Sequence, residues 1–206
     1  MIAIIDYDAG NIKSVEKALQ FIGEEAILTR KPEEILSAER IILPGVGCFS
    51  DAMTNLHKYD LPAVINEAVE RKIPFLGICA GLQLLFEESE ESPGVQGLGL
   101  LSGQILKIPA RKGLKIPHMG WNSLQLQNEG RLFAGLDDEE YVYFVHSYYL
   151  QAKDETIVKA TTEYGIDIHA SVECDNIFGC QFHPEKSSDV GLKILKNFTT
   201  IKREGE

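Results

Sequence analysis

The stretch GICAGLQ, residues 77–83, places Cys79 between two glycines at the end of an apolar run that begins at Ile73. This G-x-C-x-G frame is similar to the G-x-S-x-G elbow, in which the nucleophile sits on a tight strand-to-helix turn. A helix that starts directly after the cysteine would point its first N–H groups at the sulfur and favour the thiolate. Free cysteine is also one of the residue types most often buried in a core. The pentapeptide alone therefore leaves two interpretations open, a nucleophile and a structural thiol.

A cysteine nucleophile needs a general base, which a third group must hold in place. Among the five histidines, His183 is the candidate, because it follows the apolar run at residues 177–182 and Pro184 stops that run. Glu185 could accept a hydrogen bond from the imidazole, which would fix its tautomer and stabilise the imidazolium. Taken alone, this stretch is typical of a surface turn. Its coincidence with the cysteine elbow favours a Cys–His–Glu site.

The other histidines do not indicate a metal centre. His57 lies among polar residues and is predicted to be on the surface, whereas His169 lies in a predicted strand and is expected to be structural. No two histidines have the i, i+4 spacing of a helical zinc site. We therefore expect neither a metal nor another cofactor.

Strand and helix patterns alternate in the first hundred residues, and this alternation decides where the candidate groups lie. Apolar runs predict strands at residues 2–7, 25–29, 40–45 and 73–79. Helical spacing of apolar residues predicts helices at residues 11–22, 61–69 and 80–88. Continuous apolar strands separated by helices are typical of a parallel sheet covered on both faces. In such sheets the chemistry lies at the carboxyl ends of the strands, where Cys79 is expected.

The pattern changes after about residue 100, where strand-like segments follow one another with short connections. These segments cover residues 103–108, 121–126, 141–149, 156–161, 168–173 and 177–182. Short connections suggest antiparallel additions to the sheet. A last helix is predicted at about residues 187–201, and Asp60 is the expected N-cap of the helix at 61–69. Since no repeat or flexible linker divides the chain, we predict one flavodoxin-like α/β domain over residues 1–206.

The composition excludes several classes of function. Hydrophobic residues make up 44% and charged residues 25% of the 206 residues, which is ordinary for a soluble protein. The formal net charge of −11 argues against nucleic acid as a partner, because phosphate binding requires a basic surface. No apolar run approaches a membrane span, and the N-terminus lacks the features of a signal peptide. The four cysteines form no CxxC pair, which suits free thiols in the cytoplasm.

Together, the segments GICAGLQ and GCQFHPEKS resemble motifs of the class I, triad-type glutamine amidotransferases. Further segments make the chain similar to one branch of them, the glutaminase subunits of imidazole glycerol phosphate synthases; these are DYDAGNIKSV, ILPGVGCF, IPHMGWN, YFVHSYY and HPEKSS. The resemblance covers essentially the whole chain, and the set of motifs is highly specific. It implies glutamine as the substrate, Cys79 as the nucleophile, His183 as the general base and acid, and Glu185 as the group that orients His183.

The resemblance also implies which groups bind the oxyanion and the substrate. The oxyanion would accept hydrogen bonds from the backbone N–H of Ala80 and from the PGVG segment, at Val46 or Gly47. The glutamine would contact Gly47 and Gln83, and the segment HSYY at residues 146–149, with Ser147 and Tyr148, would line its amino-acid end. Ala80 departs from the family pattern, in which a bulkier residue such as leucine is more frequent at this position. Because only its backbone N–H is used, alanine should not disable the site.

A partner is implied as well, because free ammonia is mostly protonated at neutral pH and is then no longer nucleophilic. The resemblance implies a heterodimer with a (βα)8-barrel cyclase, which would use the ammonia to make imidazole glycerol phosphate and aminoimidazole carboxamide ribotide in histidine biosynthesis. Positions that match the interface of the family are Asn11, Trp121, Tyr143 and Lys186. Two alternatives stay open: a glutaminase for pyridoxal phosphate or anthranilate synthesis, and a non-catalytic flavodoxin-like regulatory module.

Overall fold

A parallel sheet forms the centre of the computed structural model, which describes residues 1–10 and 12–203. Its five strands are β1 (Ile2–Ile5), β2 (Ala26–Thr29), β3 (Arg40–Gly45), β4 (Phe75–Cys79) and β13 (Ile177–Cys180). They lie side by side in the order β2-β1-β3-β4-β13, and each neighbouring pair is parallel. The four strands predicted in the N-terminal half are therefore confirmed, together with their parallel arrangement.

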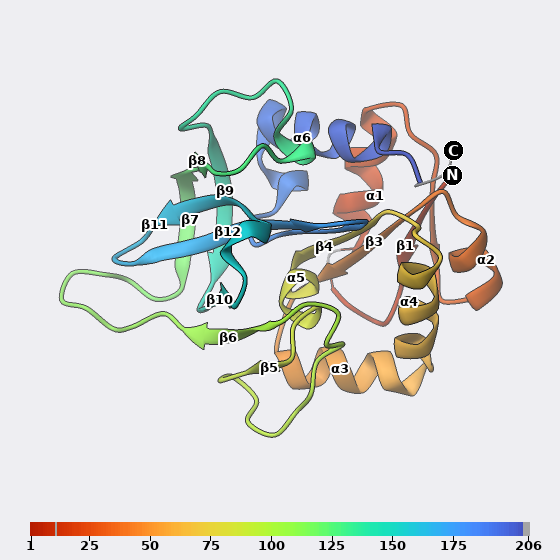
Figure 1. Cartoon of the computed structure of the whole chain (residues 1–206), viewed down its shortest axis with the longest axis horizontal. Helices are drawn as coiled ribbons and strands as arrows, with labels where there is room; N and C mark the ends of the chain where they lie inside the picture. The colour runs from red at the N-terminus through yellow and green to blue at the C-terminus, as the bar shows by residue number, and fades with distance from the viewer. Residues whose placement is uncertain (11, 204–206) are drawn as a thin grey trace.

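Helices cover both faces of this parallel sheet (Figure 1). One face carries α1 (Ile12–Phe21) and α6 (Ser188–Thr200), and the other carries α2 (Pro32–Ser37), α3 (Phe49–Lys58) and α4 (Leu61–Glu70). Successive side chains of β1 alternate between the two apolar layers, with Ile2 and Ile4 in one and Ala3 and Ile5 in the other. All four are buried, which explains why this strand is a continuous apolar run.

The C-terminal half extends the sheet with antiparallel strands, as predicted. From β13 outward the antiparallel strands are β12 (Asp167–Cys174), β10 (Tyr148–Ala152) and β6 (Gly103–Lys107), and the short β5 (Glu88–Ser89) pairs with β6 in parallel at the edge. A branch beside β12 consists of β11 (Val158–Glu163) and β8 (Gln125–Leu126). Within the described residues this sheet has eleven strands. Three short 3-10 helices lie at Arg131–Phe133 (η1), Glu155–Ile157 (η2) and Pro184–Lys186 (η3).

A separate two-stranded ribbon consists of β7 (His118–Ser123) and β9 (Tyr141–His146). We had predicted single strands at residues 121–126 and 141–149, and both are interrupted. Leu124 separates β7 from β8, and Ser147 separates β9 from β10. Each interruption moves the chain from the ribbon to the main sheet, so Ser147 is the joint between the two sheets.

Two further expectations were wrong in detail. The sequence pattern groups β13 with the antiparallel strands. It forms an antiparallel hairpin with β12, but on its other side it pairs in parallel with β4. Asp60 precedes α4 as expected but makes no side-chain capping bond, because its backbone is left-handed with φ of 55°. Only two residues separate α3 from α4, and this conformation helps the chain to turn sharply between them.

The helix expected over residues 80–88 is a single turn, α5 (Ala80–Leu84). The backbone carbonyls that would continue it accept hydrogen bonds from a later segment instead. Leu98 N donates to Leu84 O at 2.8 Å, and Leu100 N donates to Leu85 O at 2.9 Å. Competition from the segment at residues 97–101 therefore ends the helix early.

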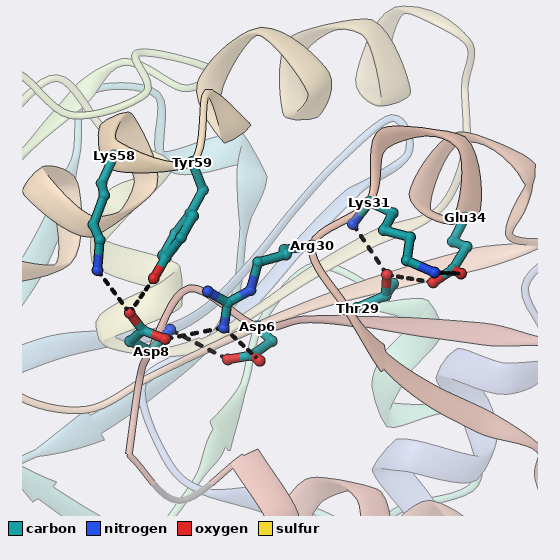
Figure 2. Close-up of polar contacts among 8 residues, drawn as sticks. All are labelled: Asp6, Asp8, Thr29, Arg30, Lys31, Glu34, Lys58 and Tyr59. Atoms are coloured by element: carbon teal, nitrogen blue, oxygen red, sulfur yellow. Dashed lines mark hydrogen bonds and ion pairs between the residues drawn. The ribbon is translucent and has the colours of Figure 1, made fainter.

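The loop that follows β1 is held at the carboxyl edge of the sheet by charged side chains (Figure 2). Asp8 accepts hydrogen bonds from the Tyr59 hydroxyl, from Arg30 Nη2 at 2.9 Å and from Lys58 Nζ at 3.2 Å. These donors lower the pKa of Asp8 to about 2. Arg30 also bonds Asp6 at 2.7 Å and lies 4.1 Å from the centre of the Tyr59 ring. The network ties the loop to the ends of β2 and α3.

The same loop also contacts the segment that follows β3. The buried Tyr7 hydroxyl donates to Pro44 O at 2.8 Å, and burial, followed by the charge of Cys79, raises the pKa of Tyr7 far above its usual value. A Cβ added to Gly10 would lie 3.1 Å from Val46 Cγ2. The loop and residues 44–46 therefore pack together beside the end of β4.

Three glycines allow the turn after β4 to pack directly on the backbone of β3. A Cβ added to Gly81 would lie 1.9 Å from Leu43 O, and one added to Gly45 would lie 2.4 Å from Gly81 N. Gly45 pairs with Cys79 across the two strands. A Cβ on Gly77 would lie 2.6 Å from Gly81 O. No side chain fits at these positions, because the atoms in the way belong to the backbone.

We expect the Gly81→Ala substitution to destabilise the protein by more than about 2 kcal/mol, because the Leu43 carbonyl cannot move without disturbing the β3–β4 pairing. The matched control is Gly94→Ala, where φ is 84° but no atom lies within 4 Å of an added Cβ. That variant carries only the cost of a left-handed backbone, about 1–2 kcal/mol. Urea unfolding of both variants measures the difference, and equal losses would show that the close contact is not limiting.

Candidate active site

Cys79 lies on the sharp strand-to-helix turn that its motif predicts. It is the last residue of β4, its φ is 54° and ψ −111°, and α5 begins at the next residue. Non-glycine residues seldom adopt a positive φ, and such strain is concentrated at functional sites. The residue is 7% exposed, and its sulfur lies 3.7 Å from Gln181 Nε2 and 4.0 Å from Val145 O. The turn thus presents the sulfur at the carboxyl edge of the sheet.

His183 and Glu185 lie at the same edge. β13, which precedes His183, is the parallel neighbour of β4, with Cys180 opposite Ile78. His183 Nδ1 lies 2.8 Å from Glu185 Oε1, and the two side chains are 2% and 1% exposed. Because a carboxylate oxygen accepts hydrogen bonds, the proton of this bond is on Nδ1. His183 Nε2 has no hydrogen-bond partner among the described residues, and its ring lines the same pocket as Cys79.

Opposing effects set the pKa of His183. Burial lowers this pKa, but the interactions with Cys79 and Glu185 raise it by more than burial lowers it, and the resulting pKa is about 9. At pH 7 the imidazole is therefore protonated and forms an ion pair with the carboxylate. An imidazolium next to a cysteine favours the thiolate form of that cysteine. The site can thus supply a nucleophile and a proton donor at the same time.

A pocket of about 430 Å³ lies over the sulfur, within the size range of small-molecule sites. Most of the residues predicted to act on the substrate or to hold it line this pocket: Val46, Gly47, Cys79, Ala80, Gln83, Ser147, Tyr148 and His183. Glu185 is not part of the lining and contacts Nδ1 of His183. Of the pocket's remaining lining residues, His146 belongs to the segment expected there, whereas Glu91, Pro117 and Val145 were not predicted.

Two backbone segments beside the sulfur could stabilise an oxyanion. Ala80 is the first residue of α5, so its N–H is one of those that the helix leaves unpaired. Val46 follows Gly45, the partner of Cys79 in the sheet, and Gly47 has a left-handed φ of 95°. Glycine tolerates this conformation without cost, which lets residues 46 and 47 turn around the pocket. The geometry is therefore compatible with both expected donors.

A buried pair of histidines fixes the other end of the pocket. His146 Nδ1 lies 2.8 Å from Tyr148 O, and its Nε2 lies 3.0 Å from His118 Nδ1. The carbonyl of Tyr148 can only accept, so Nδ1 of His146 carries a hydrogen. Because the ring of His146 is neutral at pH 7, its Nε2 accepts a hydrogen bond from Nδ1 of His118. Burial lowers the pKa of His146 to about 3 and that of His118 to about 4. The other ring nitrogen of His118, Nε2, lies 3.3 Å from Asn122 Nδ2.

The sequence carries a signal for this pair in the alternation along the two strands of the ribbon. Alternation along β7 puts His118 and Asn122 on one face, and alternation along β9 puts Phe144 and His146 on one face. His118 also stacks between the rings of Phe144 and Tyr164, at centroid distances of 4.7 and 3.9 Å. His57 is exposed as predicted, and the ring of His169 accepts a hydrogen bond from Ala152 N within the sheet.

The expected interface positions that the structure describes lie on β7, on β9 and in η3. Trp121 is 51% exposed on β7, and its ring lies edge-on to the half-buried Tyr143 ring, with centroids 6.2 Å apart. Tyr143 O accepts a hydrogen bond from His183 N at 2.9 Å, which ties the ribbon to His183. Lys186, in η3, is exposed three residues after His183. Asn11 lies outside the described residues.

Neither a metal site nor a membrane-spanning helix is found in the part of the chain that the structure describes. No group of three or more His, Cys, Asp or Glu side chains there is arranged to hold a metal ion. None of the helices there is both long and apolar enough to cross a bilayer.

A cysteine on a strand-to-helix turn and a histidine–carboxylate pair on a neighbouring parallel strand define a class of α/β enzymes that hydrolyse amides through a thioester. Comparison with protein families agrees: residues 3–201 match the family described as "Glutamine amidotransferase class-I". This chain belongs to the class-I glutamine amidotransferase family and is a glutaminase-type subunit.

Its relatives are named more narrowly. It is 52% identical over 202 residues to the "Imidazole glycerol phosphate synthase subunit HisH" of Moorella thermoacetica, covering 98% of this chain and 95% of that protein. The subunit of the same name from Methanocaldococcus jannaschii is 46% identical over 201 residues, covering 98% and 100%. A solved structure described as a glutamine amidotransferase superposes with a TM-score of 0.75 at 21% identity, covering 96% of this chain and 98% of that one, which supports the fold.

We expect the free energy of unfolding to decrease as the pH falls from about 6.5 towards 4, and to decrease less in a His118→Phe variant. The pKa of His118 is about 4 in the folded protein and 6.5 in the unfolded chain, so the unfolded chain binds the proton first in this window. Each such group contributes about 1.4 kcal/mol per pH unit. Urea unfolding at pH 7.0 and 4.5 should show a loss about 2 kcal/mol smaller in the variant, and equal losses would contradict the assignment.

Proposed function

We propose that this chain is the glutaminase subunit of an imidazole glycerol phosphate synthase and that Cys79, His183 and Glu185 hydrolyse its glutamine. The observation that carries the proposal is the 2.8 Å bond between His183 Nδ1 and Glu185 Oε1, at the edge of the sheet that holds Cys79. The identity of 52% to a HisH subunit supports the choice of synthase. In this proposal residues 1–206 form one domain that works in the cytoplasm, where its free cysteines stay reduced.

The first half-reaction forms a thioester. The thiolate of Cys79 attacks the side-chain amide carbon of glutamine, and the carbonyl electrons move onto the oxygen. The N–H of Ala80 and a backbone donor at residues 46–47 stabilise the oxyanion, and one such donor is worth about 10²–10³ in kcat. When the oxyanion collapses, the C–N bond breaks. His183 transfers its Nε2 proton to the nitrogen, which leaves as ammonia.

The second half-reaction releases glutamate. Neutral His183 accepts a proton from water through Nε2 while the water oxygen attacks the thioester carbon. The C–S bond then breaks and its electron pair returns to the sulfur, so glutamine and water have become glutamate and ammonia. Glu185 stays ionised, accepts the Nδ1 hydrogen throughout and stabilises each imidazolium. Gly47, Gln83, Ser147 and Tyr148 hold the remainder of the glutamine.

The ammonia must reach a second site before it is protonated by bulk water. We propose that a (βα)8-barrel cyclase receives it and covers the pocket edge marked by Trp121, Tyr143 and Lys186, of which Trp121 is 51% exposed. Glutamine hydrolysis with and without a co-expressed cyclase tests this pairing. Stimulation by the cyclase supports it, whereas stimulation only by an anthranilate or pyridoxal phosphate synthase would assign the chain to that enzyme.

The Cys79→Ala variant should lose glutamine hydrolysis and keep its fold, because the substitution removes only the sulfur from the turn. In complex with the cyclase it should still support synthesis from added ammonium salt, since that reaction does not use Cys79. The matched control is Cys174→Ala, which removes a half-buried thiol at the end of β12 and should keep normal activity. Glutamine-dependent turnover by Cys79→Ala would refute the proposed nucleophile.

His183→Ala should reduce glutamine hydrolysis by about 10²–10⁴-fold, the usual contribution of general acid–base catalysis. Glu185→Gln should be milder, because a neutral amide oxygen can still accept from Nδ1 but stabilises the imidazolium less. Steady-state kinetics of both variants, with circular dichroism as a check on folding, measure the order. A larger loss in a folded Glu185→Gln variant than in His183→Ala would reverse the assigned roles.

A further inference from the structure

Gln181 is a buried polar side chain in the apolar segment that leads to His183. It follows β13 directly, its exposed fraction is 0%, and its backbone N–H donates to Ala170 O at 2.8 Å. Burying an amide without hydrogen bonds is costly, so its side chain should be fully used by its neighbours. Two of these neighbours belong to the active site. Gln181 Nε2 lies 3.7 Å from Cys79 Sγ, and Gln181 Oε1 lies 3.0 Å from Gln83 Nε2.

The hydrogen bonds of Gln83 determine which end of the Gln181 amide faces the sulfur. Gln83 Nε2 lies 3.0 Å from Tyr148 O, and a backbone carbonyl can only accept. The nitrogen of Gln83 is therefore placed at Tyr148 O, and the same nitrogen also donates to Gln181. An amide receiving a hydrogen bond presents its oxygen, so Gln181 must present its nitrogen to Cys79.

This orientation is supported from outside the two glutamines. Tyr148 O also accepts a hydrogen bond from His146 Nδ1 at 2.8 Å, so this carbonyl is held between two donors. A reversed Gln83 would place two carbonyl oxygens against each other at Tyr148. A reversed Gln181 would do the same at Gln83 and would turn its oxygen towards the sulfur.

We infer that Gln181 is a further catalytic residue of the proposed glutaminase, which donates an N–H hydrogen bond to the sulfur of Cys79 and stabilises it as thiolate. The contact between Gln181 and Cys79 is a geometric observation, whereas its role in catalysis rests on the proposed function. His183 must give up its proton when ammonia leaves, whereas the amide keeps its hydrogens at every step. Gln181 is therefore a constant donor.

The donor should matter most when the thioester is hydrolysed. In that step the C–S bond breaks and the electron pair returns to the sulfur, which becomes the leaving group. A thiol that is more acidic leaves faster, so an N–H aimed at the sulfur lowers this barrier. Removing the donor should therefore slow deacylation and let the γ-glutamyl thioester accumulate.

Two substitutions separate the donor from the packing of the side chain. Gln181→Met has nearly the same length and no N–H. Gln181→Glu keeps the shape and an oxygen for Gln83, but turns a second oxygen towards the sulfur. The matched control is Ser171→Ala on β12, which deletes an equally buried group whose hydroxyl donates to Gly179 O at 2.7 Å.

The measurement is the rate of alkylation of Cys79 by iodoacetamide as a function of pH, after subtraction of the rate in the Cys79→Ala protein. A hydrogen bond to a charged group corresponds to about a tenfold effect or more, so Gln181→Met should move the thiol pKa upward by about one unit. Gln181→Glu should move it further in the same direction. Ser171→Ala should unfold at a lower temperature but keep the wild-type alkylation profile.

The kinetic readout is the amount of protein-bound glutamate after rapid acid quenching of a reaction with labelled glutamine. Gln181→Met should hold more thioester than wild type and have a lower kcat. An unchanged alkylation profile in a folded Gln181→Met variant overturns the inference. If Gln181→Met does not fold, the alkylation profile of the isosteric Gln181→Glu variant is the deciding measurement. Alkylation needs no glutamine, so a wild-type protein that hydrolyses no glutamine even together with the cyclase would refute the proposed function separately.

Discussion

The strained backbone of Cys79, with its positive φ, is the constraint on which the rest of the site depends. A strained residue of this kind costs about 1–3 kcal/mol and persists only where its surroundings fix it. β4 is paired in parallel on both sides, with β3 and β13, so the strand cannot relax sideways. Behind it the glycine at position 81 lets α5 pack directly on the carbonyl of Leu43. Because the same pairing sets the end of β13, the histidine and the sulfur meet without any long loop.

Burial alone does not determine the charge of a histidine in this protein. His183 and His146 are both buried, yet the pKa of His183 is raised to about 9 and that of His146 is lowered to about 3. The difference lies in their partners. The Nδ1 of His183 donates to a carboxylate, which compensates a positive ring, whereas that of His146 donates to a backbone carbonyl and its Nε2 faces another imidazole. One histidine is thus suited to proton transfer, and the other to holding a neutral orientation.

Much of the fold and the centre of the site could be predicted from the sequence, because the strongest signals are local. Cys79 and His183 each follow an apolar run, and parallel strands bring such ends together. The pairing of β4 with β13 could not be predicted, because the two strands are about a hundred residues apart in the sequence and no local pattern specifies which strands become neighbours. α3 was missed although Phe49, Met53 and Leu56 have helical spacing and are buried. Gln181 was missed because one polar residue in an apolar run resembles the end of a strand.

A line of directed hydrogen bonds joins the exposed ribbon to the nucleophile. It begins at Asn122 on β7, next to the exposed Trp121, and passes through His118 and His146 to Tyr148 O. The same carbonyl orients Gln83, which orients Gln181 at the sulfur. Each link has only one direction, because a backbone carbonyl in the middle accepts from both sides. No group along this line can therefore reverse its orientation on its own.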